Sequence, residues 1–240
     1  MANYDVKLRD RQQVAEGTMA FHFDKPSEFQ FKAGQYLRLT LIEPPETDAE
    51  GNRRTFTIAS APVEDDLMIA TRLRDTAFKR VLKSMPIGTQ LKLQGPFGSL
   101  TLHDEETRPA VFLAGGIGIT PFRSMALQAA RDHLPHPLFL FYANRRPEDA
   151  AFLEELQQLE TENPNYHFIG TMTKPDESGK AWNGEKGHIN KEMLARFIDD
   201  LTVPTYYTAG PPAMVDAMTN MLIEAGVNSD QIRAEQFAGY

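Results

Sequence analysis

The pattern of apolar residues changes at residues 103–108, a polar and acidic stretch of the chain. Before this stretch, apolar residues occur in short alternating or β-branched runs separated by turn-forming residues, which is typical of β-strands. Strands are expected at 19–23, 35–42, 54–59, 67–73 and 90–93. One helix interrupts them, with Asp75 as its N-cap and apolar residues at helical spacing up to Met85. The first half therefore predicts a small antiparallel β-barrel with one helix.

After this stretch, short buried strands alternate with helices. Strands are expected at 110–114, 138–143, 166–171, 205–209 and 232–237, and helices at 121–131, 148–159, 191–197 and 211–225. Such alternation indicates a doubly wound α/β domain with a parallel sheet. Since 240 residues are enough for two domains, we expect a barrel domain at residues 1–104 and an α/β domain at residues 105–240.

The absence of cysteine restricts the chemistry of these residues. It excludes disulfides, cysteine-ligated zinc, iron–sulfur clusters and thiol nucleophiles within the chain. None of the six histidines stands in an H-E-x-x-H motif or a carboxylate-rich cluster, so no metal site is expected. Redox chemistry in this chain would therefore need a bound organic cofactor.

Charge and hydropathy limit the kinds of partner and the location that we expect for this chain. The net charge is −8 and no domain is basic, which argues against nucleic acid as the main partner. No apolar run approaches the ~20 residues of a membrane-spanning helix, and the first residues lack the apolar core of a secretory signal. We therefore expect a cytoplasmic protein without membrane insertion.

The segment 114–121 (AGGIGITP) joins an expected strand to an expected helix. Its glycines allow the backbone to approach a pyrophosphate, Thr120 can cap the helix, and Pro121 suits the first helical position. An anion would then lie at the helix N-terminus. The segment departs from the G-x-G-x-x-G fingerprint at Pro121, and a simple tight turn is the alternative interpretation.

Two further segments could carry chemistry. In the strand 54–59, Arg54, Phe56 and Thr57 could serve a flavin nucleotide as a pyrophosphate ligand, a stacking ring and a hydrogen-bond partner, although an ordinary strand would look the same. The segment 206–214 is again a strand, a glycine turn and a proline-started helix. Its turn would lie at the same carboxyl edge of the sheet as segment 114–121, which is where open α/β folds bind ligands.

Four motifs in this order resemble the ferredoxin–NADP reductase family of flavoproteins, and the resemblance covers essentially the whole chain. The motifs are Arg54-x-Phe56-Thr57, Gly95-Pro96-Phe97-Gly98, Gly115-Gly116-x-Gly118-x-Thr120-Pro121 and Gly210-Pro211-Pro212. The resemblance implies an antiparallel FAD-binding barrel followed by an NAD(P)-binding domain. The nicotinamide would meet the flavin at the interface between the two domains.

The activity that the resemblance implies is an FAD-dependent oxidoreductase. It would transfer a hydride between NADPH or NADH and flavin N5, and pass electrons to a separate acceptor, with a ferredoxin or flavodoxin-like carrier favoured. Two alternatives stay open. One is reduction of a small acceptor such as free flavin, quinone or ferric chelate, and the other is an electron-transfer subunit of a larger complex.

The resemblance also implies residue roles. Thr57, facing N5, and Glu235, relaying a proton with Thr57, would be catalytic, although Glu235 could equally be a solvated carboxylate at a sheet edge. Residues implied for FAD are Arg54, Phe56, Thr57, Ile58, Thr71, Arg72 and Thr76, with Tyr240 as a cover over a cofactor ring. Residues implied for the coenzyme are Gly115, Gly116, Gly118, Thr120, Pro121, Asn144, Arg145, Thr173, Lys174, Gly210, Pro211 and Pro212.

Two residues depart from the family pattern. Phe56 stands where the family usually has tyrosine, and Ala209 stands where it often has cysteine. Ring stacking survives the first change, and hydride transfer does not require the thiol lost in the second.

The choice between NADPH and NADH rests on the turn after the third strand of the α/β domain, where the family often meets the 2′-phosphate with a hydroxyl and a basic residue. Thr173 and Lys174 stand there and favour NADPH slightly over NADH, although Asp176 and Glu177 would oppose a phosphate.

A basic stretch lies near the expected helix. It comprises Arg72, Arg74, Lys79, Arg80 and Lys83, with only Asp75 opposing them within the stretch. It could dock an acidic carrier protein, or it could simply be helix surface together with FAD phosphate contacts.

Overall fold

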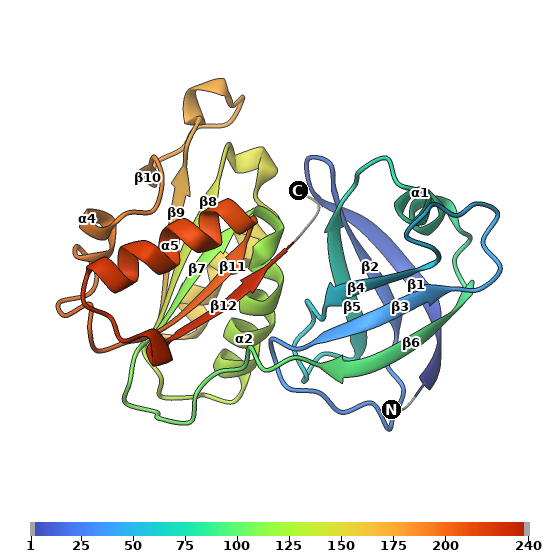
Figure 1. Cartoon of the computed structure of the whole chain (residues 1–240), viewed down its shortest axis with the longest axis horizontal. Coiled ribbons are helices and arrows are strands. Elements are labelled where there is room, and N and C mark those ends of the chain that lie inside the picture. The colour runs from blue at the N-terminus through green and yellow to red at the C-terminus, as the bar shows by residue number, and fades with distance from the viewer. Residues whose placement is uncertain (1–2, 238–240) are drawn as a thin grey trace.

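The structure, a computed structural model, describes residues 3–237, and its first half is an antiparallel sheet of six strands (Figure 1). The strands are β1 (Asn3–Ala15), β2 (Thr18–Asp24), β3 (Tyr36–Leu41), β4 (Arg53–Thr57), β5 (Asp66–Arg72) and β6 (Gln90–Phe97). Their order in the sheet is β4-β3-β6-β1-β2-β5. Just after β4, the Ala59 N–H donates to the Met68 carbonyl of β5 at 2.7 Å, which links the two edge strands. The predicted barrel is confirmed.

Strand β1 is the one barrel strand that the sequence did not predict. Its residues are mostly polar, and only Val6 and Leu8 are buried. Polar residues fill positions 9–13, so the alternation of apolar residues is confined to the first part of the strand. It forms because it pairs with β2 on one side and β6 on the other, and such long-range pairing leaves no local pattern.

Helix α1 (Ala77–Ser84) packs Phe78, Val81 and Leu82 into the barrel core. Its N-cap is Thr76 and not Asp75 as predicted, because the Thr76 hydroxyl oxygen accepts the Lys79 N–H at 3.4 Å. Asp75 forms an ion pair with Arg80 instead.

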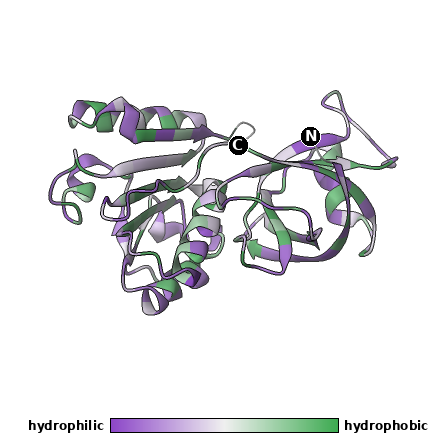
Figure 2. Ribbon diagram, turned by 90° about the horizontal axis from the view of Figure 1, so that it is seen from below, coloured by the Kyte–Doolittle hydropathy of each residue, from purple (hydrophilic) through white to green (hydrophobic). Residues whose placement is uncertain are grey.

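The second half is a parallel sheet with helices on both faces, as predicted. Its strands are β7 (Ala110–Gly115), β8 (Leu138–Asn144), β9 (Tyr166–Met172), β10 (Glu185–Lys186), β11 (Thr205–Gly210) and β12 (Ile232–Gln236), in the order β10-β9-β8-β7-β11-β12. Its α-helices are α2 (Thr120–Arg131), α3 (Leu153–Glu162), α4 (Lys191–Leu194) and α5 (Pro212–Glu224). These helices carry both hydrophilic and hydrophobic residues, as helices that cover a sheet must (Figure 2).

The two faces of this sheet form two separate cores. Phe112 of β7 packs with Phe122 of α2 and Leu156 of α3, whereas the next residue, Leu113, packs with Leu222 of α5 on the opposite face. Strands buried on both faces read as continuous apolar runs, which is why this half was easy to predict.

The main difference from the expected helices is the start of α3. It begins at Leu153, five residues after the predicted Glu148, because Pro147–Asp149 forms a separate 3-10 turn, η2, and Phe152 has a φ of 59°. Within residues 3–237, no helix has the length and apolarity needed to span a bilayer.

The segment between β6 and β7 carries a half-buried histidine, His103. The Tyr207 hydroxyl oxygen accepts the His103 backbone N–H at 2.9 Å and lies 2.9 Å from its Nδ1, while His103 Nε2 donates to the Arg108 carbonyl at 3.0 Å. Burial lowers the pKa of His103, and His136, Arg233 and Arg108 lower it further, against the opposing bond to the Arg108 carbonyl. The predicted domain boundary at residues 104 and 105 lies in this segment and stays a prediction.

The lowered pKa of His103 predicts an acid-sensitive fold. Because the unfolded chain takes up the proton first, the free energy of unfolding should fall as pH drops below the ordinary histidine pKa of about 6.5. Thermal unfolding of His103→Gln should show a weaker fall over the same range than the wild type. His167→Gln, at an exposed position on β9, is the control and should follow the wild type. Equal pH profiles for wild type and His103→Gln would contradict this prediction.

Candidate functional site

A cavity of about 510 Å³, here called the central cavity, lies where the barrel meets the parallel sheet. Residues from β4, β5, the start of α1, the β7–α2 turn and β12 line it. Eight of the predicted site residues are among them: Arg54, Phe56, Thr57, Thr71, Arg72, Thr76, Thr120 and Glu235. The structure therefore brings together side chains that are up to 181 positions apart in the chain (235 − 54).

Strand β4 supplies one wall of the central cavity. Phe56 is half-buried, with its ring 5.8 Å from the ring of Phe78 in α1. Thr57, the last residue of β4, is buried. Ile58 does not line the cavity, since its side chain is in the barrel core and its N–H donates to the Gln35 carbonyl at 2.9 Å.

Arg54 lies in the central cavity but is held by acidic residues of the loop between β3 and β4. Its Nη2 is 2.8 Å from Asp48 Oδ1 and its Nε is 3.0 Å from Glu50 Oε2. The second Asp48 oxygen accepts the N–H of Ala77, the first residue of α1, at 3.2 Å. Asp48 thus bridges a guanidinium and a helix N-terminus, which are the two kinds of donor that bind phosphate groups. The bond from Arg54 is the main cause of the lowered pKa of Asp48.

The basic stretch is not the free cationic face that its sequence suggested. Arg80 forms ion pairs with Glu46, at 2.5 Å, and with Asp75. The Lys79 ammonium donates to the Arg72 carbonyl at 2.8 Å, and Lys79 lines the central cavity. Burial lowers the pKa of Lys79. The acidic loop between β3 and β4 and the cavity itself therefore account for much of this charge.

The turn between β7 and α2 is tightly packed. Residues Gly116–Ile119 form a 3-10 helix, η1, and a Cβ at Gly118 would overlap the Ala209 carbonyl. Thr120 is the first residue of α2 and donates its hydroxyl to the Ile117 carbonyl at 3.1 Å. The prediction that Thr120 caps this helix was therefore wrong, but its buried side chain reaches the central cavity.

The turn between β11 and α5 lies beside the turn between β7 and α2. Ala114 of β7 is in register with Ala209 of β11, and a Cβ at Gly210 would lie 3.1 Å from the Gly115 carbonyl oxygen. Pro211 and Pro212 then lead into α5. The two predicted turns do meet at one edge of the sheet, although neither Gly210 nor the two prolines line the central cavity.

The turns after β8 and β9 are joined as well. The Thr173 N–H donates to the Asn144 carbonyl at 3.0 Å, and the Lys174 N–H to the Arg145 carbonyl at 2.8 Å. Asn144 is buried, and its side-chain nitrogen has no hydrogen-bond partner within residues 3–237. Lys174 is paired with Glu177 at 2.6 Å, which reduces the charge it can offer to a ligand.

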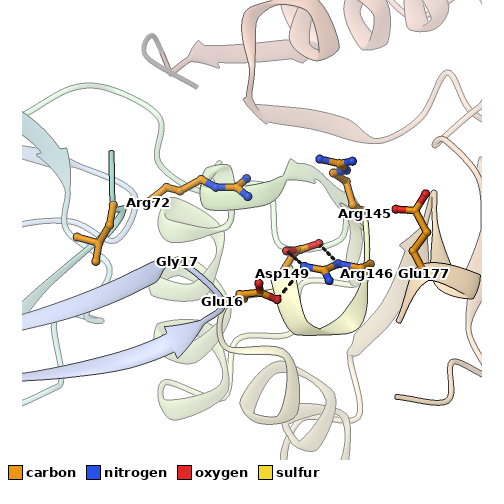
Figure 3. A pocket seen from close by; sticks show the side chains of 8 residues that line it. Glu16, Gly17, Arg72, Arg145, Arg146, Asp149 and Glu177 are labelled. Atoms are coloured by element: carbon orange, nitrogen blue, oxygen red, sulfur yellow. Dashed lines mark hydrogen bonds and ion pairs between the residues drawn. The ribbon is translucent and has the colours of Figure 1, made fainter. Parts of the chain in front are cut away.

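A second cavity of about 490 Å³, here called the arginine cavity, lies between the domains (Figure 3). Arg72 enters it from the barrel, and Arg145 and Arg146 enter it from the turn after β8. Arg146 is paired with Glu16 at 2.8 Å and with Asp149 at 2.9 Å. In the part of the chain that the structure describes, the guanidinium groups of Arg72 and Arg145 form no ion pair. Glu177 also lines the cavity, and its pKa is lowered mainly by the hydrogen bond with Lys174 and further by the charge of Arg145. Guanidinium groups of this kind can bind an anionic ligand.

Glu235 lies on β12, next to the last described residues of the chain. It is half-buried and lines the central cavity together with Thr57. Burial raises the pKa of Glu235, which favours a carboxyl group that can hold a proton. Tyr240, the predicted cover of a cofactor ring, lies outside the described residues.

The comparisons with known proteins agree with this layout. Residues 5–102 match the oxidoreductase FAD-binding domain, and residues 112–220 match the oxidoreductase NAD-binding domain. The fold and the matched domains define a two-domain flavoprotein with an FAD-binding barrel and an NAD-binding α/β domain. The chain belongs to the ferredoxin–NADP reductase family.

Several relatives are named as reductase subunits or reductase components. The chain is 29% identical to the glycine betaine monooxygenase reductase subunit of Chromohalobacter salexigens, over 92% of this chain and 60% of that protein. It is 26% identical to the phenol hydroxylase P5 protein of Acinetobacter pittii, over 97% of this chain and 64% of that protein. The chain therefore spans less than two thirds of the length of these relatives.

A solved structure shares the whole fold. The ferredoxin NADP+ reductase of Neisseria gonorrhoeae, solved with FAD and NADP bound, superposes with a TM-score of 0.80 at 21% identity. The match covers 98% of both chains. The two chains therefore share the same two-domain fold.

Asp48 competes for the donors that a cofactor phosphate would use, which predicts the effect of removing its charge. Asp48→Asn should bind FAD more tightly, by up to about tenfold, because Arg54 and the α1 N-terminus are then freer to bind a phosphate. FAD fluorescence titration of the cofactor-free protein measures this affinity. Glu46→Gln is the matched control: it removes one charge from the same loop, but its partner is Arg80. Weaker FAD binding by Asp48→Asn would show that Asp48 supports the site instead.

Proposed function

We propose that this chain is an FAD-dependent oxidoreductase that takes a hydride from NAD(P)H at flavin N5 and passes electrons to a separate acceptor. The observation that carries the proposal is the central cavity, because one space is lined by both the FAD-binding and the NAD-binding domain. Bound FAD would supply the conversion between two-electron and one-electron transfer. The proposed boundary between the two domains stays at residues 104 and 105.

The residues around the central cavity suit FAD. Arg54 and Arg72 would bind its phosphates, with Thr76 at the start of α1. Phe56 would stack on a ring and Thr57 would donate a hydrogen bond near N5. These roles are supported by the position of each side chain on the cavity wall and by the family pattern.

The coenzyme would bind along the turns that follow β7, β8, β9 and β11. Gly115, Gly116, Gly118, Thr120, Pro121, Asn144, Arg145, Thr173, Lys174, Gly210, Pro211 and Pro212 are the proposed contacts. The buried Asn144 amide without a partner and the unpaired Arg145 guanidinium support this placement. Glu235 would hold a proton near the reacting ring, and its raised pKa supports that role over a solvated carboxylate.

We propose another protein as the electron acceptor. Several relatives are named as reductase subunits or components of monooxygenases. Another is the toluate 1,2-dioxygenase electron transfer component of Pseudomonas putida, which is 26% identical over 99% of this chain. An oxygenase component or a ferredoxin-like or flavodoxin-like carrier fits that pattern. No cysteine in residues 1–240 can ligate an iron–sulfur cluster, so a cluster would belong to the acceptor or to residues beyond this sequence.

Anaerobic rapid mixing of the purified, FAD-loaded protein tests the proposal. NADPH or NADH should bleach the visible absorption of the flavin in a single turnover, and added ferredoxin should restore it. A protein that binds no FAD, or whose bound FAD is reduced by neither coenzyme, would refute the activity. Reoxidation by ferric chelates or quinones and not by carrier proteins would select the small-acceptor alternative.

The unpaired Arg145 predicts the coenzyme preference. Arg145→Ala should weaken NADPH binding about tenfold, the cost of one charge-assisted hydrogen bond, and change NADH binding by less than about twofold. Lys174→Ala should change either affinity little, because its exposed ammonium is already paired with Glu177. Titrations of the FAD-loaded variants with NADP+ and NAD+ measure both affinities. Equal loss for the two coenzymes in Arg145→Ala would rule out a preference set by this residue.

A further inference from the structure

Arg123 has a buried side chain whose guanidinium donors are fully used. It lies in the first turn of α2, three residues after Thr120, and its side chain is 6% exposed. It donates five hydrogen bonds, which equals the number of N–H groups that a guanidinium carries. Its guanidinium also lies 5.0 Å from the centre of the Phe152 ring. The contacts therefore fix the orientation of this side chain as well as its position.

The acceptors come from both domains. Glu155 of α3 accepts from Nε at 2.7 Å and from Nη2 at 2.6 Å, within the α/β domain. Across the interface, Ala59 accepts from Nη1 through its carbonyl at 2.8 Å, and Glu64 accepts from Nη1 and Nη2 at 3.0 and 3.2 Å. Glu64 is fixed in turn, since it accepts the Ala61 N–H at 2.5 Å.

Two neighbouring contacts extend this interface along α2. The Ser124 hydroxyl donates to the Ser60 carbonyl at 2.7 Å, and both serines are buried. The Val63 N–H donates to Gln128 Oε1 at 2.9 Å. Figure 1 shows α2 on the side of the sheet that faces the barrel. Residues 59–64 and α2 are thus joined by a continuous row of directional bonds, here called the α2 clasp.

The α2 clasp is close in the chain to residues that form two walls of the central cavity. Ala59 is two residues after Thr57, and Arg123 is three residues after Thr120. Thr57 belongs to the strand implied for the flavin, and Thr120 belongs to the turn implied for the coenzyme. A shift of Arg123 relative to Ala59 would therefore move one wall of the cavity relative to the other.

The chemistry of the clasp resists such a shift. Burial opposes the charge of Arg123, but the hydrogen bonds with Glu155 and Glu64 outweigh it and raise the pKa of the guanidinium. Because the guanidinium is planar and binds both carboxylates, it fixes the orientation of Glu64 relative to Glu155 as well as the distance between them. Loss of the Glu64 carboxylate would leave part of this buried charge without its partner from the barrel, so the contacts across the interface would rearrange.

We propose that Arg123 is a positioning residue for hydride transfer, which fixes the coenzyme-binding turn against the flavin-binding strand by clasping Ala59 and Glu64. This inference rests on the proposed function. Hydride transfer needs the two reacting atoms within about 3–3.5 Å, and a displacement of ~1 Å can cost ~100-fold in rate. Arg123 itself touches neither ring in this arrangement and acts through the two backbone segments it joins.

Two isosteric variants test the proposal. Glu64→Gln removes the charge that crosses the interface, and Glu155→Gln removes the equivalent charge from within the α/β domain. In rapid mixing, Glu64→Gln should lower the limiting rate of flavin reduction by about 10- to 100-fold and leave the coenzyme dissociation constant within about twofold. Glu155→Gln should keep a rate within a few-fold of the wild type. Their melting temperatures measure any common loss of stability.

A second readout uses the FAD-free protein. Hydrogen exchange at the Val63 amide, which donates to Gln128, reports whether the clasp opens. Exchange should be faster in Glu64→Gln than in Glu155→Gln or the wild type. Arg123→Lys should behave as Glu64→Gln does, because an ammonium keeps the charge but cannot bind two carboxylates in a fork.

The outcomes separate this inference from the proposed function. If FAD-loaded wild-type protein is reduced by neither coenzyme, the proposed function fails, and the positioning role fails with it. If the wild type is reduced and Glu64→Gln has the limiting rate of Glu155→Gln, the proposed function stands and the positioning role is overturned. Equal hydrogen exchange at Val63 in the two variants would also overturn it.

Discussion

The contact between α2 and residues 59–64 is polar and includes the buried residues Arg123, Ser124 and Ser60, and the arrangement of the two domains depends on it. An apolar interface can slide at little cost, because the hydrophobic effect has no direction. The buried guanidinium and the two buried serines must each keep their partners, since an unmade buried hydrogen bond costs about 1–3 kcal/mol, and more for a charged group. Few relative placements satisfy all of them. The central cavity has one wall from each domain, so its shape depends on this restricted placement of the two domains.

Inside the α/β domain, close packing of the backbone fixes the positions of the turns after β7 and β11. The parallel register of β7 and β11 brings Gly118 against the Ala209 carbonyl, and Gly210 against Gly115. Ala209 itself is fully buried. The packing of these turns therefore requires glycine at Gly118 and Gly210, whether or not a ligand also approaches the protein backbone there. Strand register therefore decides where these two turns lie.

Local patterns in the sequence were enough for the elements with regular burial, but not for the contacts between them. The parallel strands were predictable because both faces are buried, whereas β1 was missed because its alternation is confined to the residues up to Leu8. The proposed site residues come from motifs that resemble a family, and eight of them line the central cavity. The partners of Arg54 and Arg123 were not predictable, since Asp48 lies in an irregular loop and Glu64 is 59 residues from Arg123 along the chain. Such ion pairs depend on the path of loops, which no spacing rule specifies.

The distribution of pairing among the arginines is more informative than the net charge of −8. Arg54, Arg80, Arg123 and Arg146 are all engaged by carboxylates, so their charges are largely balanced within the protein. Arg72 and Arg145 have no such partner among residues 3–237, and both face the arginine cavity from opposite domains (Figure 3). An acidic molecule repels dinucleotides at long range, but unpaired guanidinium groups at a cleft focus the local potential toward an anion. Local pairing, and not total charge, therefore determines where phosphate groups can approach this chain.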